Sequence, residues 1–348
     1  METLISSRAA QHVFPISHAS DVSAARRAGQ KLAVDLGFDE VKAGRLAIVI
    51  TEAGTNILKH AGEGTLYVMR AQSGASMAGV DVLAVDDGPG IADLATSIQD
   101  GVSTAGTAGN GLGALKRQSD EFDVWSQRGR GSVFFMRLWR GSPPPTPCGV
   151  EVGALYVPLA GEQACGDGWA ASCDLDGATL LVVDGLGHGP EAAKAACAAV
   201  EALERFPSKP PEEVVQRAHE GLRITRGAAL SVARIEYTGD ALRFAGIGNV
   251  AATVVGHGSR RTMVSHNGIV GHNMRKVQEF TAPFPPGALC VMHSDGLQTQ
   301  WNLDDYPGLL GRAPAIVAGV LMRDFIRGRD DALVLVARRK ENMGGGDT

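Results

Sequence analysis

The sequence predicts two α+β domains joined by a proline-rich linker. The chain has 348 residues, which is long for one hydrophobic core and comfortable for two domains. Residues 140–149, RGSPPPTPCG, place four prolines within five positions. Proline cannot continue a helix or a central strand, so this segment is expected to be a stiff spacer. The expected organisation is a domain over 1–140, a linker over 141–149, a domain over 150–340 and a flexible tail over 341–348.

The first domain is predicted to begin with two helices. The first covers DVSAARRAGQKLAVDLG (21–37), with Asp21 or Ser20 as its N-cap, and the second runs from Asp39 to His60. Alternating apolar residues then predict strands near 64–72, 79–87, 121–127 and 131–139. This order predicts one mixed sheet with helices, an α+β domain.

The second domain is predicted to consist mainly of short antiparallel strands. Helices are expected near 189–205, 211–223 and 313–327. The expected strands are 149–157, 168–175, 177–184, 228–237, 241–248, 252–257, 287–295 and 331–339.

Composition excludes several classes of protein. The net charge is −5, which gives no reason to expect nucleic-acid binding. No apolar stretch approaches the ~18 residues of a membrane span, and the first residues lack a secretory pattern. The five cysteines are odd in number and lack CxxC spacing, so we expect reduced thiols in a cytoplasmic protein.

The first domain carries three segments that together indicate a nucleotide site. Glu52 and Asn56 in ITEAGTNILKHAG share one helix face, where Asn56 offers an oxygen to magnesium and Glu52 can accept a proton. Alone, such a pair is typical of a solvated helix surface. Asp86 then ends a strand in VDDGPGI, and Gly88 and Gly90 are expected to leave room for a ligand near the backbone. A glycine-rich loop leads into a helix, a setting that binds phosphate: Gly106, Gly109, Gly111 and Gly113.

The order of these segments resembles the GHKL (Bergerat) ATP-binding α/β sandwich, and within it the small serine kinases of the RsbT and RsbW type. The likeness spans about residues 13–139, and GNGLGALKRQSDEFDVWSQRGRGSVFFMRLW resembles the RsbT branch especially. The resemblance implies that Asp86 binds the adenine amino group, that Asn56 ligates Mg²⁺, and that Glu52 is the general base. It also implies that the 106–113 glycines surround the triphosphate of ATP.

Four acidic residues in the second domain adjoin predicted strands: Asp167 in CGDGW, Asp184 in VVDGLGHG, Asp295 in MHSDGL and Asp330 in GRDDALVLV. Asp-Gly pairs usually mark only turns. A folded sheet that gathered four carboxylates would need cations to neutralise them, and two divalent metals can activate water for attack on a phosphoester.

This pattern resembles the SpoIIE and RsbX branch of metal-dependent serine/threonine phosphatases, over about residues 150–339. DGLGHG is its most specific piece, supported by GIGNV (246–250) and RDDALVLVARR. The resemblance implies an α/β-β/α sandwich with two Mn²⁺ or Mg²⁺ ions. They would be held by Asp184, the Gly185 carbonyl, Asp167, Asp295 and Asp330, with Asp331 as the alternative to Asp330. Asp184 is expected to be essential for hydrolysis.

Together the resemblances imply a bifunctional regulator of bacterial partner switching. It would phosphorylate STAS-domain anti-anti-sigma or switch proteins with Mg-ATP and remove phosphate from phosphoserine or phosphothreonine. Two alternatives stay open: the first domain binds a sigma factor as an anti-sigma module, or it is an ATP sensor that controls the phosphatase. A homodimer is also compatible with the resemblance.

Overall fold

The computed structural model describes residues 3–7, 11–73, 77–94, 97, 111–142 and 149–340. The chain forms two compact units, and each unit draws on separate parts of the sequence. The N-terminal unit consists of residues 9–145 and 306–323. The C-terminal unit consists of residues 1–8, 146–305 and 324–348. Residues 1–8 and 306–323 therefore belong to the unit opposite to the one expected from their place in the sequence.

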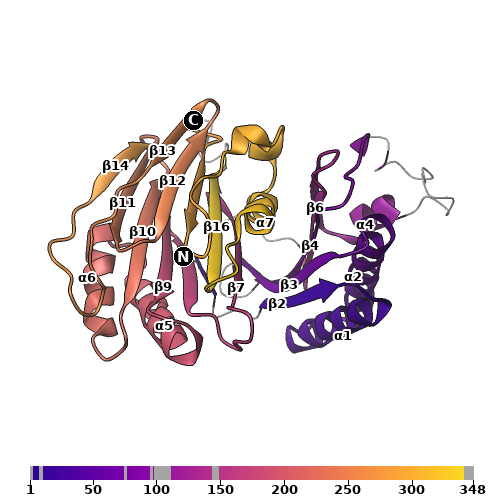
Figure 1. Cartoon of the computed structure of the whole chain (residues 1–348), viewed down its shortest axis with the longest axis horizontal. Coiled ribbons are helices and arrows are strands. Elements are labelled where there is room, and N and C mark those ends of the chain that lie inside the picture. Colours follow the sequence, from indigo (N-terminus) through magenta and orange to yellow (C-terminus); the bar gives the residue numbers. More distant parts are fainter. Residues whose placement is uncertain are drawn as a thin grey trace. The chain divides into compact units, whose positions relative to one another are not determined.

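The N-terminal unit is built on a five-stranded sheet (Figure 1). Every pairing in it is antiparallel, so the expectation of a mixed sheet is wrong. The first strand was not predicted; its segment QHVFPI has only six residues, includes a proline, and pairs with β3. The strand order is β2 (Gln11–Ile16), β3 (Gly64–Ser73), β4 (Met77–Asp86), β6 (Ser132–Trp139) and β5 (Glu121–Ser126).

Helices α1 (Ala19–Asp35) and α2 (Glu40–His60) cover one face of this sheet (Figure 1). Helix α2 begins where it was predicted, and Asp39 is its N-cap, because its side chain accepts a hydrogen bond from the Lys42 amide at 2.7 Å. The predicted cap of α1 is displaced by one turn. His18 is the N-cap, and Asp21 lies inside the helix, where its carboxylate accepts the His18 amide at 2.8 Å.

Helix α7 (Pro314–Phe325) packs on the opposite face of the same sheet. Alternate residues of β4 point to opposite faces; Val80 and Val82 pack toward α1 and α2, whereas Leu83 and Val85 do not join that core. A Cβ at Gly319 of α7 would lie 3.0 Å from a Leu83 methyl and 3.5 Å from a Val85 methyl. The segment 306–323 thus supplies the second layer on this sheet.

The C-terminal unit is a sandwich of two antiparallel sheets (Figure 1). One sheet has the order β1 (Thr3–Ser6), β8 (Asp167–Cys173), β9 (Gly177–Gly185), β10 (Ala228–Glu236), β11 (Ala241–Ile247) and β14 (Phe280–Pro283). The other has the order β13 (Ser259–Thr262), β12 (Ala251–Gly256), β15 (Leu289–His293), β16 (Ala332–Arg339) and β7 (Val150–Val157).

Two apolar layers hold this unit together. Side chains from the facing sheets fill the first, including Phe244, Phe284 and Met292. Helices α5 (Gly189–Arg205) and α6 (Pro211–Leu222) form the second by packing on β8 to β11. Both helices were predicted, and Pro190 and Pro211 lie in their first turns, where a missing amide costs little.

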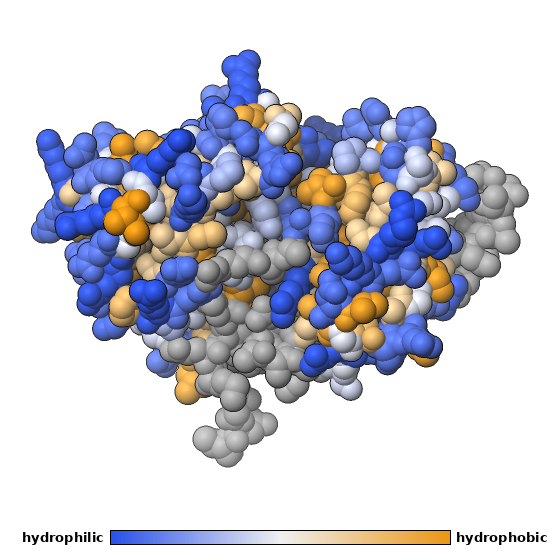
Figure 2. All heavy atoms as spheres, turned by 90° about the horizontal axis from the view of Figure 1, so that it is seen from below, coloured by the Kyte–Doolittle hydropathy of each residue, from blue (hydrophilic) through white to orange (hydrophobic). Residues whose placement is uncertain are grey.

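One cysteine of the C-terminal unit differs from the expected free thiols. Cys173 is disulfide-bonded, contrary to the expected reduced thiols, whereas Cys165, Cys197 and Cys290 are free. None of the described helices has the length and hydropathy that a membrane span requires. Hydrophilic residues dominate the face in Figure 2, and apolar residues are scattered among them. Single exposed apolar residues of this kind are common on the surfaces of folded proteins.

Candidate active sites

Asp86, the predicted purine contact, is the last residue of β4, the central strand of the N-terminal sheet. Its Oδ1 atom accepts the Gly88 amide at 2.9 Å, which fixes the orientation of the carboxylate. Burial raises the pKa of Asp86 above its ordinary value. Arg323 of α7 donates a hydrogen bond to the Asp86 carbonyl oxygen at 2.8 Å. The strand end is therefore held by contacts on both its side chain and its backbone.

The glycines that follow Asp86 serve a different purpose from the one expected. A Cβ at Gly88 would lie 2.7 Å from the Ala61 Cβ, and a Cβ at Gly90 would lie 2.1 Å from the Gln127 carbonyl oxygen. Gly90 also has a φ of +69°, which disfavours other residues. These two glycines let the loop pack against the chain itself, so the expectation of open space for a ligand at them is wrong.

Glu52 and Asn56 lie on α2, both partly buried, as the helix spacing predicted. A Cβ at Gly64 would touch both Ile57 of α2 and the Asp86 Cβ, so the Asn56 region of α2 lies close to the end of β4. The Asn56 Nδ2 atom is buried and has no hydrogen-bond partner in the described structure. An unpaired buried N–H group is costly unless an acceptor satisfies it, and a phosphate oxygen of a nucleotide is such an acceptor. The Oδ1 atom of the same side chain is the one that can ligate Mg²⁺.

The predicted glycine loop is only partly described. Gly106 and Gly109 lie outside the described residues, whereas Gly111 begins helix α4 (Gly111–Gln118) and Gly113 lies in its first turn. Helix α4 packs against α2. The helix start is thus where the sequence predicted it, next to the helix that carries Glu52 and Asn56.

Two of the predicted phosphatase residues are direct neighbours. Asp167 begins β8 and Asp184 lies near the end of β9, and the two are opposite each other in the antiparallel ladder. The Gly185 amide donates to the Gly166 carbonyl at 3.1 Å, which extends the pairing past Asp184. Directly opposed like charges repel, so this pair implies a positive ligand.

The second sheet adds Asp295 and holds Asp167 in place. The Ser294 hydroxyl donates to the Asp167 carboxylate at 2.6 Å and accepts the Leu333 amide at 2.9 Å. The next residue, Asp295, accepts a hydrogen bond at 2.6 Å from the side-chain amide of Asn249, in the GIGNV segment. Ser294 therefore connects the two sheets at the carboxylate site.

The doublet Asp330-Asp331 divides into two roles. Asp331 is buried, and its two oxygens accept the amides of Leu159 and Gly166, each at 2.7 Å. Asp330 is exposed and lines a cavity together with Asp295. Because the oxygens of Asp331 are engaged by the backbone, Asp330 is the better candidate for a ligand.

The gathered carboxylates alter one another's ionisation. Burial raises the pKa of Asp184 to about 7, and the charges of Asp295, Asp330 and Asp331 act in the same direction. Burial and the charge of Asp184 also raise the pKa of Asp167 well above its usual value. In the part of the chain that the structure describes, no three acidic, histidine or cysteine side chains form a closed metal-ligating group. The hard oxygen donors and their mutual repulsion nevertheless suit divalent cations.

Sequence reasoning missed two residues that support these sites, Ser294 and Arg323. A serine between a strand and SDG carries no motif of its own, and Arg323 lies far from the nucleotide motifs in sequence. His188, in the DGLGHG segment, is the N-cap residue of α5, and its Nδ1 atom pairs with Glu162 at 2.7 Å.

Comparisons with known proteins find relatives for both parts of the chain. Residues 16–138 match the family described as histidine kinase-like ATPase domain, and residues 175–340 match Stage II sporulation protein E. The serine/threonine-protein kinase RsbT of Bacillus subtilis is 38% identical over 119 residues, which are 34% of this chain and 89% of that protein. The phosphoserine phosphatase RsbX of the same organism is 25% identical over 138 residues, 39% of this chain and 69% of that protein.

A solved structure adds to this likeness. It is described as "The bacterial stressosome: a modular system that has been adapted to control secondary messenger signaling". The similar chain has 30% identity and a TM-score of 0.51, and the match covers 54% of this chain and 99% of that one.

The fold and the family matches define a class of protein: a serine/threonine phosphatase of the SpoIIE type fused to a histidine kinase-like ATPase domain. Both relatives are Rsb proteins, and the chain is accordingly a regulator of the partner-switching kind. Through its N-terminal part, the chain belongs to the RsbT family of serine/threonine-protein kinases.

Proposed function

We propose that the chain both adds and removes phosphate on serine or threonine of a STAS-domain regulator. The observation that carries the phosphatase half is the ladder pair Asp167–Asp184, surrounded by Asp295 and Asp330. The kinase half is supported by the likeness to RsbT and by the unpaired Asn56 amide near Asp86.

In the N-terminal unit, Asp86 would accept the amino group of adenine and Asn56 would ligate the magnesium ion of ATP. Glu52, four residues before Asn56 on α2, would take the proton of the incoming hydroxyl. Phosphoryl transfer depends mainly on positioning and charge neutralisation. The glycine-rich segment 106–113 would surround the phosphates at the start of α4.

In the C-terminal unit, Asp167, Asp184, the Gly185 carbonyl, Asp295 and Asp330 would hold two divalent ions, Mn²⁺ or Mg²⁺. Bound divalent ions would supply an activated water for attack on phosphorus. The chain's own contribution is positional: Ser294 orients Asp167, and Asn249 orients Asp295. The carboxylate charges also keep the anionic substrate away until cations are present.

A phosphotransfer assay with labelled ATP and candidate STAS proteins tests the proposal. We expect label to accumulate on serine or threonine with Asp184→Asn, to decay with the wild type, and to be absent with Glu52→Ala. Matched controls are Asp176→Asn and Glu63→Ala, two exposed acids outside both sites. Label that persists with the wild type would contradict the phosphatase half.

The alternatives give different outcomes in the same experiment. If no variant labels a STAS protein, although ATP binds, the kinase assignment fails. Co-purification of a sigma factor with the full chain would then favour the anti-sigma module. A change of phosphatase rate with a non-hydrolysable ATP analogue, without labelling, would instead favour the nucleotide sensor.

A further inference from the structure

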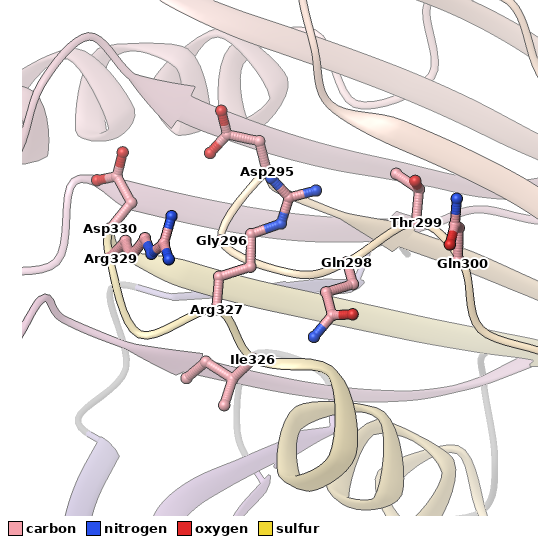
Figure 3. Close-up of a pocket in the computed structure, with 9 residues that line it drawn as sticks. All are labelled: Asp295, Gly296, Gln298, Thr299, Gln300, Ile326, Arg327, Arg329 and Asp330. Atoms are coloured by element: carbon pink, nitrogen blue, oxygen red, sulfur yellow. The ribbon is translucent and has the colours of Figure 1, made fainter.

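A cavity of about 590 Å³ opens beside the carboxylate site of the C-terminal unit, and it contains two arginines without an assigned role. Asp295 and Asp330 lie in its wall, and Arg327 and Arg329 lie in the same wall (Figure 3). The proposed function uses both carboxylates but neither arginine. Positive side chains next to a cation-binding site need an explanation, because they repel the cations that the carboxylates would bind.

Backbone contacts fix where the first arginine lies. The segment around Ile326 runs antiparallel to the segment around Leu297 and forms an isolated bridge with it. The Gln298 amide donates to the Phe325 carbonyl at 2.9 Å, and the Arg327 amide donates to the Gly296 carbonyl at 2.8 Å. Arg327 is thereby held opposite Gly296, the residue that follows Asp295.

The second arginine is placed by the chain itself, since Arg329 directly precedes Asp330. Figure 3 shows the Arg327 side chain extended toward Asp295 and the Arg329 side chain beside Asp330. Both arginines therefore accompany a candidate metal ligand on the rim of the same cavity.

Both guanidinium groups are exposed, and among the described residues neither has a hydrogen bond or an ion pair. Two other arginines of the same unit have carboxylate partners: Arg339 pairs with Asp240 at 2.5 Å, and Arg243 pairs with Glu279 at 2.5 Å. Arg327 and Arg329 thus keep their planar donor forks available to a ligand. Such forks match the oxygens of a phosphate group in a bidentate manner.

We propose that Arg327 and Arg329 bind the phosphoryl group of a phosphoserine or phosphothreonine side chain and hold it against the carboxylate site. This inference rests on the proposed phosphatase function and adds the residues that recognise its substrate. In this arrangement the carboxylates bind the metal cations, and the arginines bind the phosphoryl dianion of the substrate. The cavity is open, which suits a phosphorylated side chain carried by a protein.

Two probes test this proposal on the full chain: p-nitrophenyl phosphate for turnover and inorganic phosphate for binding by calorimetry. For the double variant Arg327→Gln/Arg329→Gln, we expect KM to rise at least tenfold with kcat within about threefold. Phosphate affinity should fall by a similar factor, since each charge-assisted contact is strong. The single variant Arg327→Lys should keep only part of the wild-type affinity for phosphate, because lysine keeps the charge but lacks the planar pair of donors.

Arg261→Gln is the matched control, since Arg261 is an exposed arginine of β13 in the same unit. It should change neither KM nor phosphate affinity. Unchanged KM and phosphate affinity in the double variant would overturn the inference, as would a loss confined to kcat. If the wild type binds phosphate through the arginines but hydrolyses no phosphoester, the proposed function fails and the binding site stands.

Discussion

At the scale of single residues, the adjacent carboxylates Asp330 and Asp331 should give opposite phenotypes. Asp331→Ala leaves one buried and one partly buried amide without an acceptor, so we expect a loss of about 3 kcal/mol in the free energy of unfolding. Asp330→Ala should change stability by less than about 1 kcal/mol, because its side chain is exposed, yet should abolish hydrolysis. Urea denaturation and phosphoester hydrolysis measure the two effects. Equal loss of stability in both variants would contradict the division of roles.

His219 on α6 should make stability depend on pH. Its Nδ1 atom accepts the Gly271 amide at 3.0 Å, which only the neutral ring can do. Partial burial lowers the pKa of His219 below 6.5; Arg223 and His272 act in the same direction, and Glu220 opposes them. Below about pH 6.5 the unfolded chain therefore binds more protons than the folded chain, and stability falls as pH decreases.

Urea denaturation at pH 5.5 and 7.5 measures this dependence. We expect the loss of stability on acidification to be smaller in His219→Gln than in the wild type. His257→Gln, which changes an exposed histidine, is the control and should behave as the wild type. An identical pH dependence in all three proteins would contradict the role of His219.

The sequence was sufficient for residues whose role follows from a local pattern. The start of a helix at Asp39, Glu52 and Asn56 on one helix face, and the strand-end positions of Asp86 and Asp184 all depend on patterns within a few residues. The different roles of the neighbouring residues Asp330 and Asp331 could not be predicted from local spacing. Asp331 is distinguished from Asp330 only by amides about 165 and 172 positions away, which tertiary structure brings to it.

At the scale of elements, helix α7 should be sensitive to added volume on one side. Gly319 approaches Leu83 and Val133, and a Cβ there would lie 3.0 Å from a methyl group of each. Gly319→Val should therefore cost about 1–3 kcal/mol in the free energy of unfolding. The loss is expected even though valine has a higher helix propensity than glycine. Gly311→Val is the control, since a Cβ at Gly311 meets nothing within 4 Å. Equal stability of the two variants would contradict this packing.

Elements were predictable where they are long and apolar. The helices at 40–60 and 189–205 and the buried strands β9 and β16 carry strong patterns. The short strands β1, β13 and β14 have four residues each and were missed. Such strands exist because a neighbour offers an edge, so their own residues hardly signal them.

At the scale of the whole molecule, residues 9–145 should not behave as an independent domain. Without residues 306–323, the sheet face that includes Leu83, Val85 and Val133 loses the helix that packs on it. Exposed apolar patches of this kind promote association. We expect the fragment 9–145 to aggregate, and the same fragment with 306–323 appended through a flexible linker to remain monomeric or dimeric. Size-exclusion chromatography with light scattering distinguishes these outcomes; a well-dispersed shorter fragment would contradict the expectation.

The interleaving of the two units also has a consequence for protein synthesis. Residues 9–145 leave the ribosome first, but the helix that completes their unit is made only after residues 146–305. At ordinary elongation rates this delay is on the order of ten seconds or more. During that time the apolar face of the nascent sheet lacks the helix that packs on it. Strand β1 likewise cannot pair until β8 has been synthesised. We therefore expect nascent chains of this protein to expose this apolar face until residues 306–323 have been synthesised.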